Sequence, residues 1–174
     1  MKITKLTKDK LEETIRLLEK EFGKGTEEED TVRESLEASL NPENYKDYLG
    51  RNKMFGNTYY VALTRDGEVI GVTGLHYSKE DDALWGGWMT VAKEKRRGLS
   101  ITGYKLLRRI LEEAETSKKK IIRLYIYDRE EGGRTHKLYK KLGFKEYKRN
   151  NHGRNGKIFL EARVEELLRV RDKK

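Results

Sequence analysis

Between residues 58 and 127 three short strand-like runs are followed by a run with helical spacing and then by an alternating run, and this order restricts the fold. Three predicted strands come first, at Thr58 to Arg65, Val69 to Tyr77 and Leu84 to Val91, and turn residues separate them. A run with helical spacing follows, about Ser100 to Thr116. Apolar and polar or aromatic residues then alternate from Ile121 to Tyr127. Strands joined by short turns and then by a helical crossover predict an α/β (α+β) fold with a twisted mixed β-sheet and helices on both faces.

The flanking segments add further elements and no linker or internal repeat, so residues 1–174 are expected to form one domain. Helices are predicted over Lys8 to Phe22, from Asp30 or Thr31 to Leu40, and over Arg134 to Leu142, with Thr7 as a capping residue of the first. Further strands are predicted over Lys2 to Leu6, Phe144 to Lys148 and Lys157 to Arg163, and a terminal helix over Glu165 to Arg171. The segment from Glu43 to Asn57 has no clear period.

Two details refine the central part. The pair Gly86-Gly87 lies inside a predicted strand, which indicates a bulge or a place where another group approaches the backbone. In the long helix, one apolar side is expected to be buried, formed by Ile101, Tyr104, Leu107, Ile110, Leu111 and Ala114.

The composition is that of a folded, strongly charged protein. Charged residues make up 40% and hydrophobic residues 35%, with a formal net charge of +9, which attracts anions in general. The chain has no cysteine, which excludes disulfides and thiolate chemistry. Abundant Lys and Glu without glutamine is typical of proteins from hot environments.

The sequence has no apolar run of about 20 residues and no secretion signal, so we expect a cytoplasmic protein with no membrane partner. The three histidines are dispersed, and no metal site is expected. His136 lies in a Lys-rich helix and is expected to face solvent.

The run RRGLSITGYKLL, Arg96 to Leu107, joins the third predicted strand to the long helix. The first N–H groups of a helix have no partner within it, and with the helix dipole they attract anions. Glycine would let a phosphate approach closely, and Ser100 and Thr102 occupy the positions where it is most expected. Both residues are small and carry hydroxyl donors, so the turn keeps its donors. The alternative is an ordinary helix that begins with basic residues.

The runs VAKEKRRGLSITGYKLL, IIRLYIYD and LYKKLGF, in this order, closely resemble the GNAT superfamily of acyl-CoA-dependent N-acyltransferases. The resemblance covers about Tyr59 to Arg163 and implies a single GNAT-like domain with acetyl-CoA as co-substrate. It also implies that the main chain of Met89, Thr90 and Val91 pairs with the pantetheine arm. The implied pyrophosphate site is the turn, formed by Arg96, Arg97, Gly98, Leu99, Ser100, Ile101, Thr102 and Gly103. The family's CoA-contacting Asn position falls on Gly132.

The resemblance assigns Tyr139, in the LYKKLGF run, as the general acid that protonates the CoA thiolate as it leaves. The alternative for Tyr139 is core packing beside Leu138 and Leu142. No carboxylate stands in the strand before the turn, so the candidates for the general base are Asp128 and His76, directly or through water. The alternative for Asp128 is that it caps its loop, and the alternative for His76 is a packing role alone.

The sequence predicts acetyl transfer to an amine, and the acceptor is left open among small amines, protein N-termini, lysine side chains and aminoacyl-tRNA. A homodimer through the C-terminal strands is an expectation from the resemblance. The rival hypothesis is a catalytically weak or inactive GNAT-fold protein that binds CoA, or nucleic acid through Arg96, Arg97 and Lys118 to Lys120.

Overall fold

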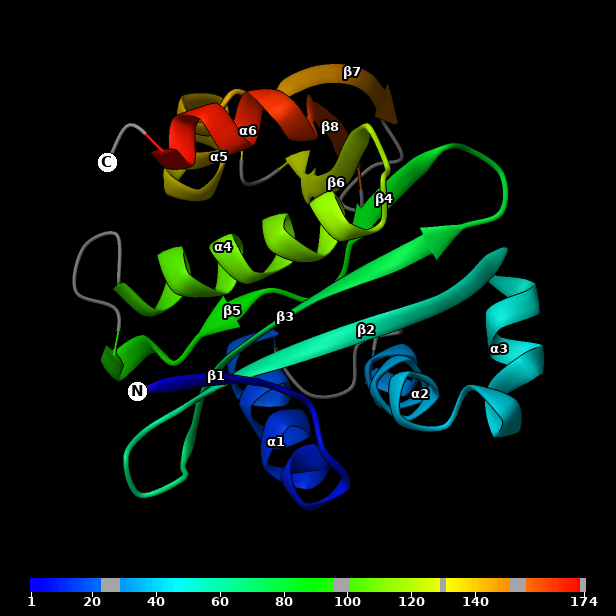
Figure 1. The fold of residues 1–174 in the computed structure, drawn as a ribbon, viewed down its shortest axis with the longest axis vertical. Helices are drawn as coiled ribbons and strands as arrows, with labels where there is room; N and C mark the ends of the chain where they lie inside the picture. Colours follow the sequence, from blue (N-terminus) through cyan, green and yellow to red (C-terminus); the bar gives the residue numbers. More distant parts are fainter. Residues whose placement is uncertain (23–28, 96–100, 129–130, 151–155, 173–174) are drawn as a thin grey trace. The chain divides into compact units, whose positions relative to one another are not determined.

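The computed structural model describes residues 1–22, 29–95, 101–128, 131–150 and 156–172 (Figure 1). The chain divides into two compact units, which are described separately. Unit 1 consists of Met1–Asp81 and Gly87–Ile110, and unit 2 consists of Asp82–Gly86 and Leu111–Lys174. The helix α4, Ile101–Thr116, contributes residues to both units.

Unit 1 contains the N-terminal helices and a set of antiparallel strands. Its helical segments are η1 (Lys8–Lys10), α1 (Leu11–Phe22), α2 (Glu29–Leu40), η2 (Pro42–Tyr45), α3 (Lys46–Arg51) and η3 (Lys93–Lys95). Its strands are β1 (Lys2–Lys5), β2 (Met54–Leu63), β3 (Val69–Ser78) and β5 (Thr90–Val91).

All strand pairs in unit 1 that the structure describes are antiparallel. β2 lies between β1 and β3, and the short β5 pairs with the far side of β3 through Gly71 opposite Val91 and Val72 opposite Thr90. β2 and β3 form the predicted hairpin, whose turn includes Gly67 at φ +84°. This left-handed conformation is one that glycine adopts without a steric cost.

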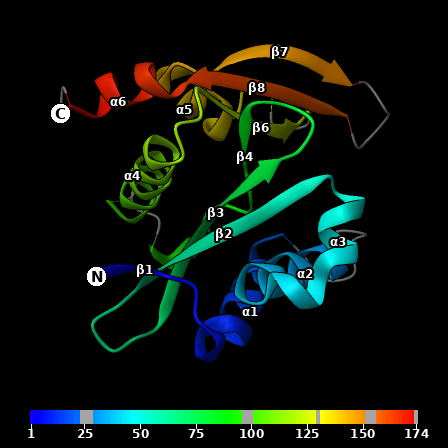
Figure 2. The ribbon, with the colours of Figure 1, turned by 45° about the vertical axis from the view of Figure 1, so that its right-hand side comes forward.

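Helices cover both faces of the unit 1 sheet. On one face, α1 and α2 pack against the strands in a buried cluster that includes Leu18, Leu36 and Val61 (Figures 1 and 2). On the other face, Leu106 of α4 packs with Ala62 and neighbouring apolar residues. Burial of each large aliphatic side chain stabilises the fold by about 2 kcal/mol, so the two apolar layers hold the strands in place.

Unit 2 has a mixed sheet in the order β4, β6, β8, β7. Its elements are β4 (Ala83–Gly86), β6 (Ile121–Tyr127), α5 (Arg134–Leu142), β7 (Lys145–Asn150), β8 (Lys157–Arg163) and α6 (Val164–Asp172). β4 and β6 are parallel, whereas β8 is antiparallel to both of its neighbours. The predicted α/β class with a mixed sheet is therefore confirmed.

The alternation predicted for β6 is confirmed as well. Ile122, Leu124 and Ile126 are buried, and the opposite face carries aromatic side chains stacked with cations. Tyr125 of that face contacts Phe159 of β8, and the Lys157 ammonium lies 4.0 Å from the centroid of the Tyr125 ring. Cations attract the negative faces of aromatic rings, which keeps this half-exposed layer ordered.

Three local predictions were wrong. The strand predicted from Leu84 to Val91 is broken after Gly86 and resumes at Thr90, so it forms two short strands. Thr7 makes no capping hydrogen bond, although it stands at the N-cap of η1. Ile101 is 71% exposed, because it opens α4 before the helix reaches the apolar layer, whereas Leu106 is fully buried. Leu107, Ile110, Leu111 and Ala114 are buried as predicted.

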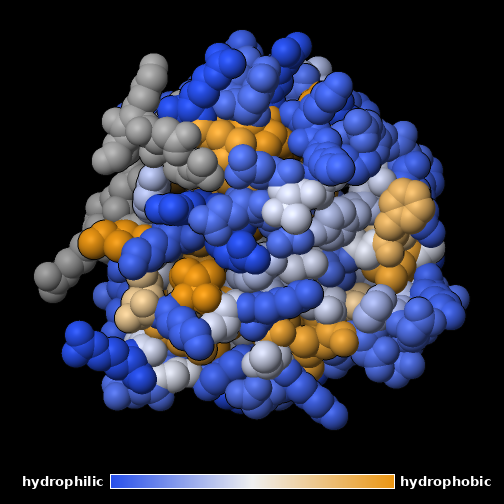
Figure 3. All heavy atoms as spheres, viewed as in Figure 1, coloured by the Kyte–Doolittle hydropathy of each residue, from blue (hydrophilic) through white to orange (hydrophobic). Residues whose placement is uncertain are grey.

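Hydrophilic residues dominate the face seen in Figure 3, and hydrophobic atoms reach it in separate patches. In the part of the chain that the structure describes, no helix is long and apolar enough to cross a bilayer.

Candidate active site

The strand and the helix of the predicted anion-binding arrangement are both present in the structure. β5 ends at Val91, Lys93–Lys95 form a short 3-10 turn, and α4 begins at Ile101. The predicted site residues Arg96, Arg97, Gly98, Leu99 and Ser100 lie outside the described residues. The described part of the predicted turn is therefore the first turn of α4, with Ile101, Thr102 and Gly103.

Thr102 faces the sheet and not the solvent. Its side chain is buried, and its hydroxyl donates to the Met1 sulfur at 3.1 Å. Its methyl group also lies close to Gly71 of β3. The Thr102 hydroxyl is thus engaged within unit 1, and the group that this residue would offer an anion is its main-chain N–H.

The residues before β5 leave the strand ladder. Gly87 N–H donates to the Gly74 carbonyl at 2.9 Å, and Ala92 N–H donates to the Ile70 carbonyl at 3.0 Å, with the two-residue β5 ladder beside it. Trp88 and Met89 lie outside the assigned strands. Gly87 also confirms the predicted close approach, since a Cβ there would lie 2.8 Å from the Tyr59 hydroxyl and 2.9 Å from His76 Nε2.

His76 ends a chain of polar groups in unit 1. Its Nε2 lies 2.9 Å from the Tyr59 hydroxyl, which in turn lies 2.8 Å from Ser35 Oγ of α2. Tyr59 and Ser35 are fully buried, whereas His76 is only partly buried. Burial lowers the pKa of His76 to about 4, so the imidazole is neutral at pH 7.

Asp128 follows β6 in unit 2 and packs tightly against Gly156. A Cβ at Gly156 would lie 1.8 Å from Asp128 Oδ2, so only glycine leaves room for this carboxylate. Arg149 lies 3.9 Å from Oδ1, which is buried and has no hydrogen-bond partner among the described residues. The Asp128 main chain also holds the loop, because its carbonyl accepts from Glu131 N–H at 2.9 Å.

Tyr139 stands on α5 and packs against the end of its own motif. Its ring meets the Phe144 ring edge-on, with centroids 5.4 Å apart. Gly143 adopts φ +104°, and the reversal lets Phe144 N–H donate to the Tyr139 carbonyl at 3.0 Å. The LYKKLGF run is thus a helix C-terminus that fixes the orientation of a half-buried tyrosine.

His136 contradicts its predicted exposure. It is only 2% exposed, and its Nδ1 accepts a hydrogen bond from Gly132 N–H at 3.0 Å. Gly132, two residues before α5, has φ +68°. The helical pattern placed His136 among lysines, and it gave no signal for this hydrogen bond to a residue four positions earlier.

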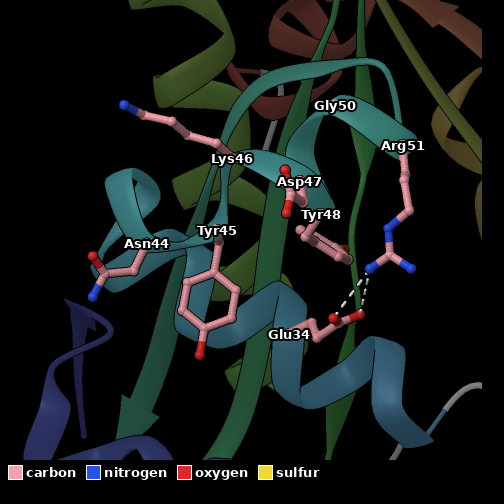
Figure 4. Close-up of a pocket in the computed structure, with 8 residues that line it drawn as sticks. All are labelled: Glu34, Asn44, Tyr45, Lys46, Asp47, Tyr48, Gly50 and Arg51. Carbon is pink, nitrogen blue, oxygen red and sulfur yellow. Dashed lines mark hydrogen bonds and ion pairs between the residues drawn. The ribbon is translucent and has the colours of Figure 1, made fainter.

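A groove of about 760 Å³ lies beside α2 and α3 in unit 1 (Figure 4). Arg51 spans its rim and donates to Glu34 Oε1 at 3.1 Å. Tyr48 points from α3 toward the interior in Figure 4 and is buried. Within the described ranges, no group of three or more His, Asp or Glu side chains is arranged to hold a metal ion.

Two kinds of comparison place the chain among known proteins. A family model described as an acetyltransferase (GNAT) domain matches residues 56–146, whereas no curated protein matches the sequence. Among solved structures, a GNAT-family protein from Desulfovibrio desulfuricans is similar with a TM-score of 0.74 and 15% identity, over 94% of this chain and 98% of that one.

Two further similar structures are named for their activities. The aminoglycoside 6'-N-acetyltransferase from Enterococcus faecium has a TM-score of 0.68 and 17% identity, over 94% of this chain and 97% of that chain. The PaiA N-acetyltransferase from Thermoplasma acidophilum, solved in complex with coenzyme A, has a TM-score of 0.64 and 18% identity, over 93% and 98%. At these identities the similarity shows the fold.

Proposed function

Because the chain belongs to the acetyltransferase (GNAT) family, we propose that it is an N-acetyltransferase that moves an acetyl group from acetyl-CoA directly to an amine. The observation that carries this proposal is the family match itself, which spans the strand–turn–helix region and the LYKKLGF run together. The coenzyme A complex of PaiA, a protein of the same fold, supports the choice of co-substrate.

The turn between β5 and α4 is proposed to bind the CoA pyrophosphate through main-chain N–H groups. The basic residues Arg96 and Arg97 and the N-terminus of a 16-residue helix favour negative charge there. Met89, which lies outside the strand ladder, is proposed with Thr90 and Val91 to pair with the pantetheine arm. Alignment of amine and thioester would supply much of the rate enhancement.

Tyr139 is proposed to donate its phenolic proton to the departing CoA thiolate. The amine lone pair forms the C–N bond, the C–S bond breaks, and Tyr139 then recovers its proton from solvent. The contact with Phe144 and the reversal at Gly143 support this role, because they hold the Tyr139 side chain in one orientation.

His76 is proposed as the group that removes a proton from the attacking nitrogen, with Asp128 as the second candidate. A pKa of about 4 suits His76 poorly to a free ammonium, whose pKa is about 10. It suits the nitrogen of the tetrahedral adduct better, because the positive charge that develops there makes the N–H far more acidic. The acceptor amine would thus enter in its neutral form.

The acceptor is proposed only as an amine, because the similar structures do not agree on one. The net charge of +9 disfavours a free polyamine, since like charges repel unless the binding cleft is locally acidic. Small amines, lysine side chains, protein N-termini and aminoacyl-tRNA therefore belong in one panel.

The test measures acetyl-CoA binding by calorimetry and thioester consumption with that panel of amines. We expect binding together with turnover on at least one amine, and a loss of turnover of at least about tenfold in Tyr139→Phe with an unchanged melting temperature. Tyr147→Phe, at an exposed tyrosine of β7, is the matched control. Binding without turnover would favour the rival hypothesis of an inactive CoA-binding protein, and unchanged turnover would remove Tyr139 from the mechanism.

A further inference from the structure

Three side chains from three elements meet in the interior of unit 1. Ser35 comes from α2, Tyr59 from β2 and His76 from β3, and the Tyr59 hydroxyl lies within hydrogen-bond distance of both other side chains. Asn57 is bonded to the same serine, because its side-chain Nδ2 donates to the Ser35 main-chain carbonyl at 2.7 Å. Buried polar groups destabilise a core unless they are paired, so this arrangement demands that all members stay in place.

Two glycines clear the space that Tyr59 occupies. Tyr59 lies opposite Gly74 in the β2–β3 ladder, and a Cβ at Gly74 would lie 2.4 Å from the Tyr59 ring. Gly87 leaves the same space at the other end of the ring, beside the hydroxyl group and His76 Nε2. Any larger residue at either position would push the phenol away from the imidazole. The backbone is therefore shaped around the Tyr59–His76 contact.

The contact fixes which ring nitrogen of His76 is occupied. Nε2 is engaged by Tyr59, so Nδ1 is the nitrogen left for another partner. Ser35 Oγ accepts from Asn57 Nδ2 at 3.3 Å, and its second lone pair can accept from the Tyr59 hydroxyl. When Tyr59 donates to Ser35, the Tyr59 oxygen is the acceptor toward His76, which then carries its proton on Nε2.

We propose that Tyr59 is a positioning residue for His76, whose Nδ1 accepts the proton of the attacking amine while Nε2–H donates to the Tyr59 hydroxyl. This inference rests on the proposed function. The C–N bond forms, an N–H bond of the resulting adduct then breaks as its proton moves to Nδ1, and the imidazolium later releases the proton to solvent. Tyr59 stabilises the imidazolium by accepting from Nε2–H, and the Tyr59 hydroxyl proton is held by Ser35.

The test combines a spectroscopic and a kinetic measurement on the full chain. The ¹⁵N shifts of the His76 ring report its tautomer without any substrate, and we expect the Nε2–H form in the wild type. Tyr59→Phe keeps the ring that packs on Gly74 and removes only the hydroxyl group. We expect it to change the ¹⁵N shifts of His76, to shift the acid limb of the kcat profile, and to lower kcat at least about tenfold with the KM for acetyl-CoA unchanged.

Tyr60→Phe is the matched control, because the Tyr60 hydroxyl accepts from Arg109 and does not touch His76. Ser35→Ala, which leaves Tyr59 intact, is a second variant in case Tyr59→Phe folds poorly, and a smaller change in the same ¹⁵N shifts is expected. An Nδ1–H tautomer in the wild type, or wild-type shifts and pH profile in Tyr59→Phe, would overturn the inference. The two proposals can fail separately. If the wild type has the expected tautomer and Tyr59→Phe changes it, the positioning role is supported. If the same wild-type protein is inactive on every amine, the proposed transferase function is refuted.

Discussion

Replacement of Gly74 by alanine tests whether the fold depends on the space beneath Tyr59. The added Cβ would lie 2.4 Å and 2.5 Å from two ring carbons of Tyr59, distances that atoms in folded proteins do not tolerate. Tyr59 is fully buried and its hydroxyl is bonded on both sides, so the ring has no free volume into which it can move. Either the ring or the β2–β3 pairing must shift.

The cost can be worked from these contacts. Overpacking of a core by one methyl group costs about 1–3 kcal/mol, and each of the two hydrogen bonds of the Tyr59 hydroxyl contributes about 1 kcal/mol when it is broken. The free energy of unfolding should therefore fall by about 3–5 kcal/mol. For a chain of this length, that corresponds to a decrease in melting temperature of roughly 10 °C.

The assay is urea unfolding followed by circular dichroism, with Gly56→Ala as the control. Gly56 lies on the same hairpin, and a Cβ there would meet no atom within 4 Å, so its free energy of unfolding should change by less than about 1 kcal/mol. A loss below about 1 kcal/mol in Gly74→Ala, equal to that of the control, would refute the reasoning. It would mean that the Tyr59 ring is not confined as the structure shows.

Two further predictions concern protonation and packing. The pKa of His76 is about 4 in the folded chain and about 6.5 when unfolded, so between these values the unfolded state binds more protons. The free energy of unfolding should fall by up to about 3 kcal/mol as the pH drops from about 6.5 to 4. In acid titrations at fixed urea, His76→Asn should lack this part of the pH dependence. The same pH dependence in the variant and the wild type would contradict the prediction. Gly156→Ala should lower the free energy of unfolding by about 2 kcal/mol in thermal melts, because its Cβ would collide with the Asp128 carboxylate, whereas Gly50→Ala, which meets no atom within 4 Å, should have little effect. Equal stabilities of these two variants would show that Asp128 moves without cost.

The spacing of apolar residues predicted a helix or strand well where the element buries one continuous apolar face. The alternation of Ile122, Leu124 and Ile126 and the helical spacing of Leu107, Ile110 and Ala114 were confirmed. Such spacing is a local property, since it depends only on the rise and turn of one strand or helix. The two ends of the strand–turn–helix region were predictable for the same reason.

Errors arose where a contact outside the apolar period decides the environment of a side chain. Leu106 of α4 is buried because Gly71 of the strand β3 has no side chain to exclude it. A Cβ at Gly71 would lie 2.9 Å from Leu106. His136 is buried, and its Nδ1 accepts from the N–H of Gly132, four positions earlier. Neither contact leaves a trace in the local apolar pattern.

The sequence by itself determined the class of fold, the family and the candidate residues His76, Asp128 and Tyr139, because residue spacing and short motifs are written along the chain. Only the tertiary structure joined Ser35, Tyr59 and His76, which are 24 and 17 positions apart. Strand register and helix packing decide which side chains meet across such separations, and these depend on the whole apolar core at once.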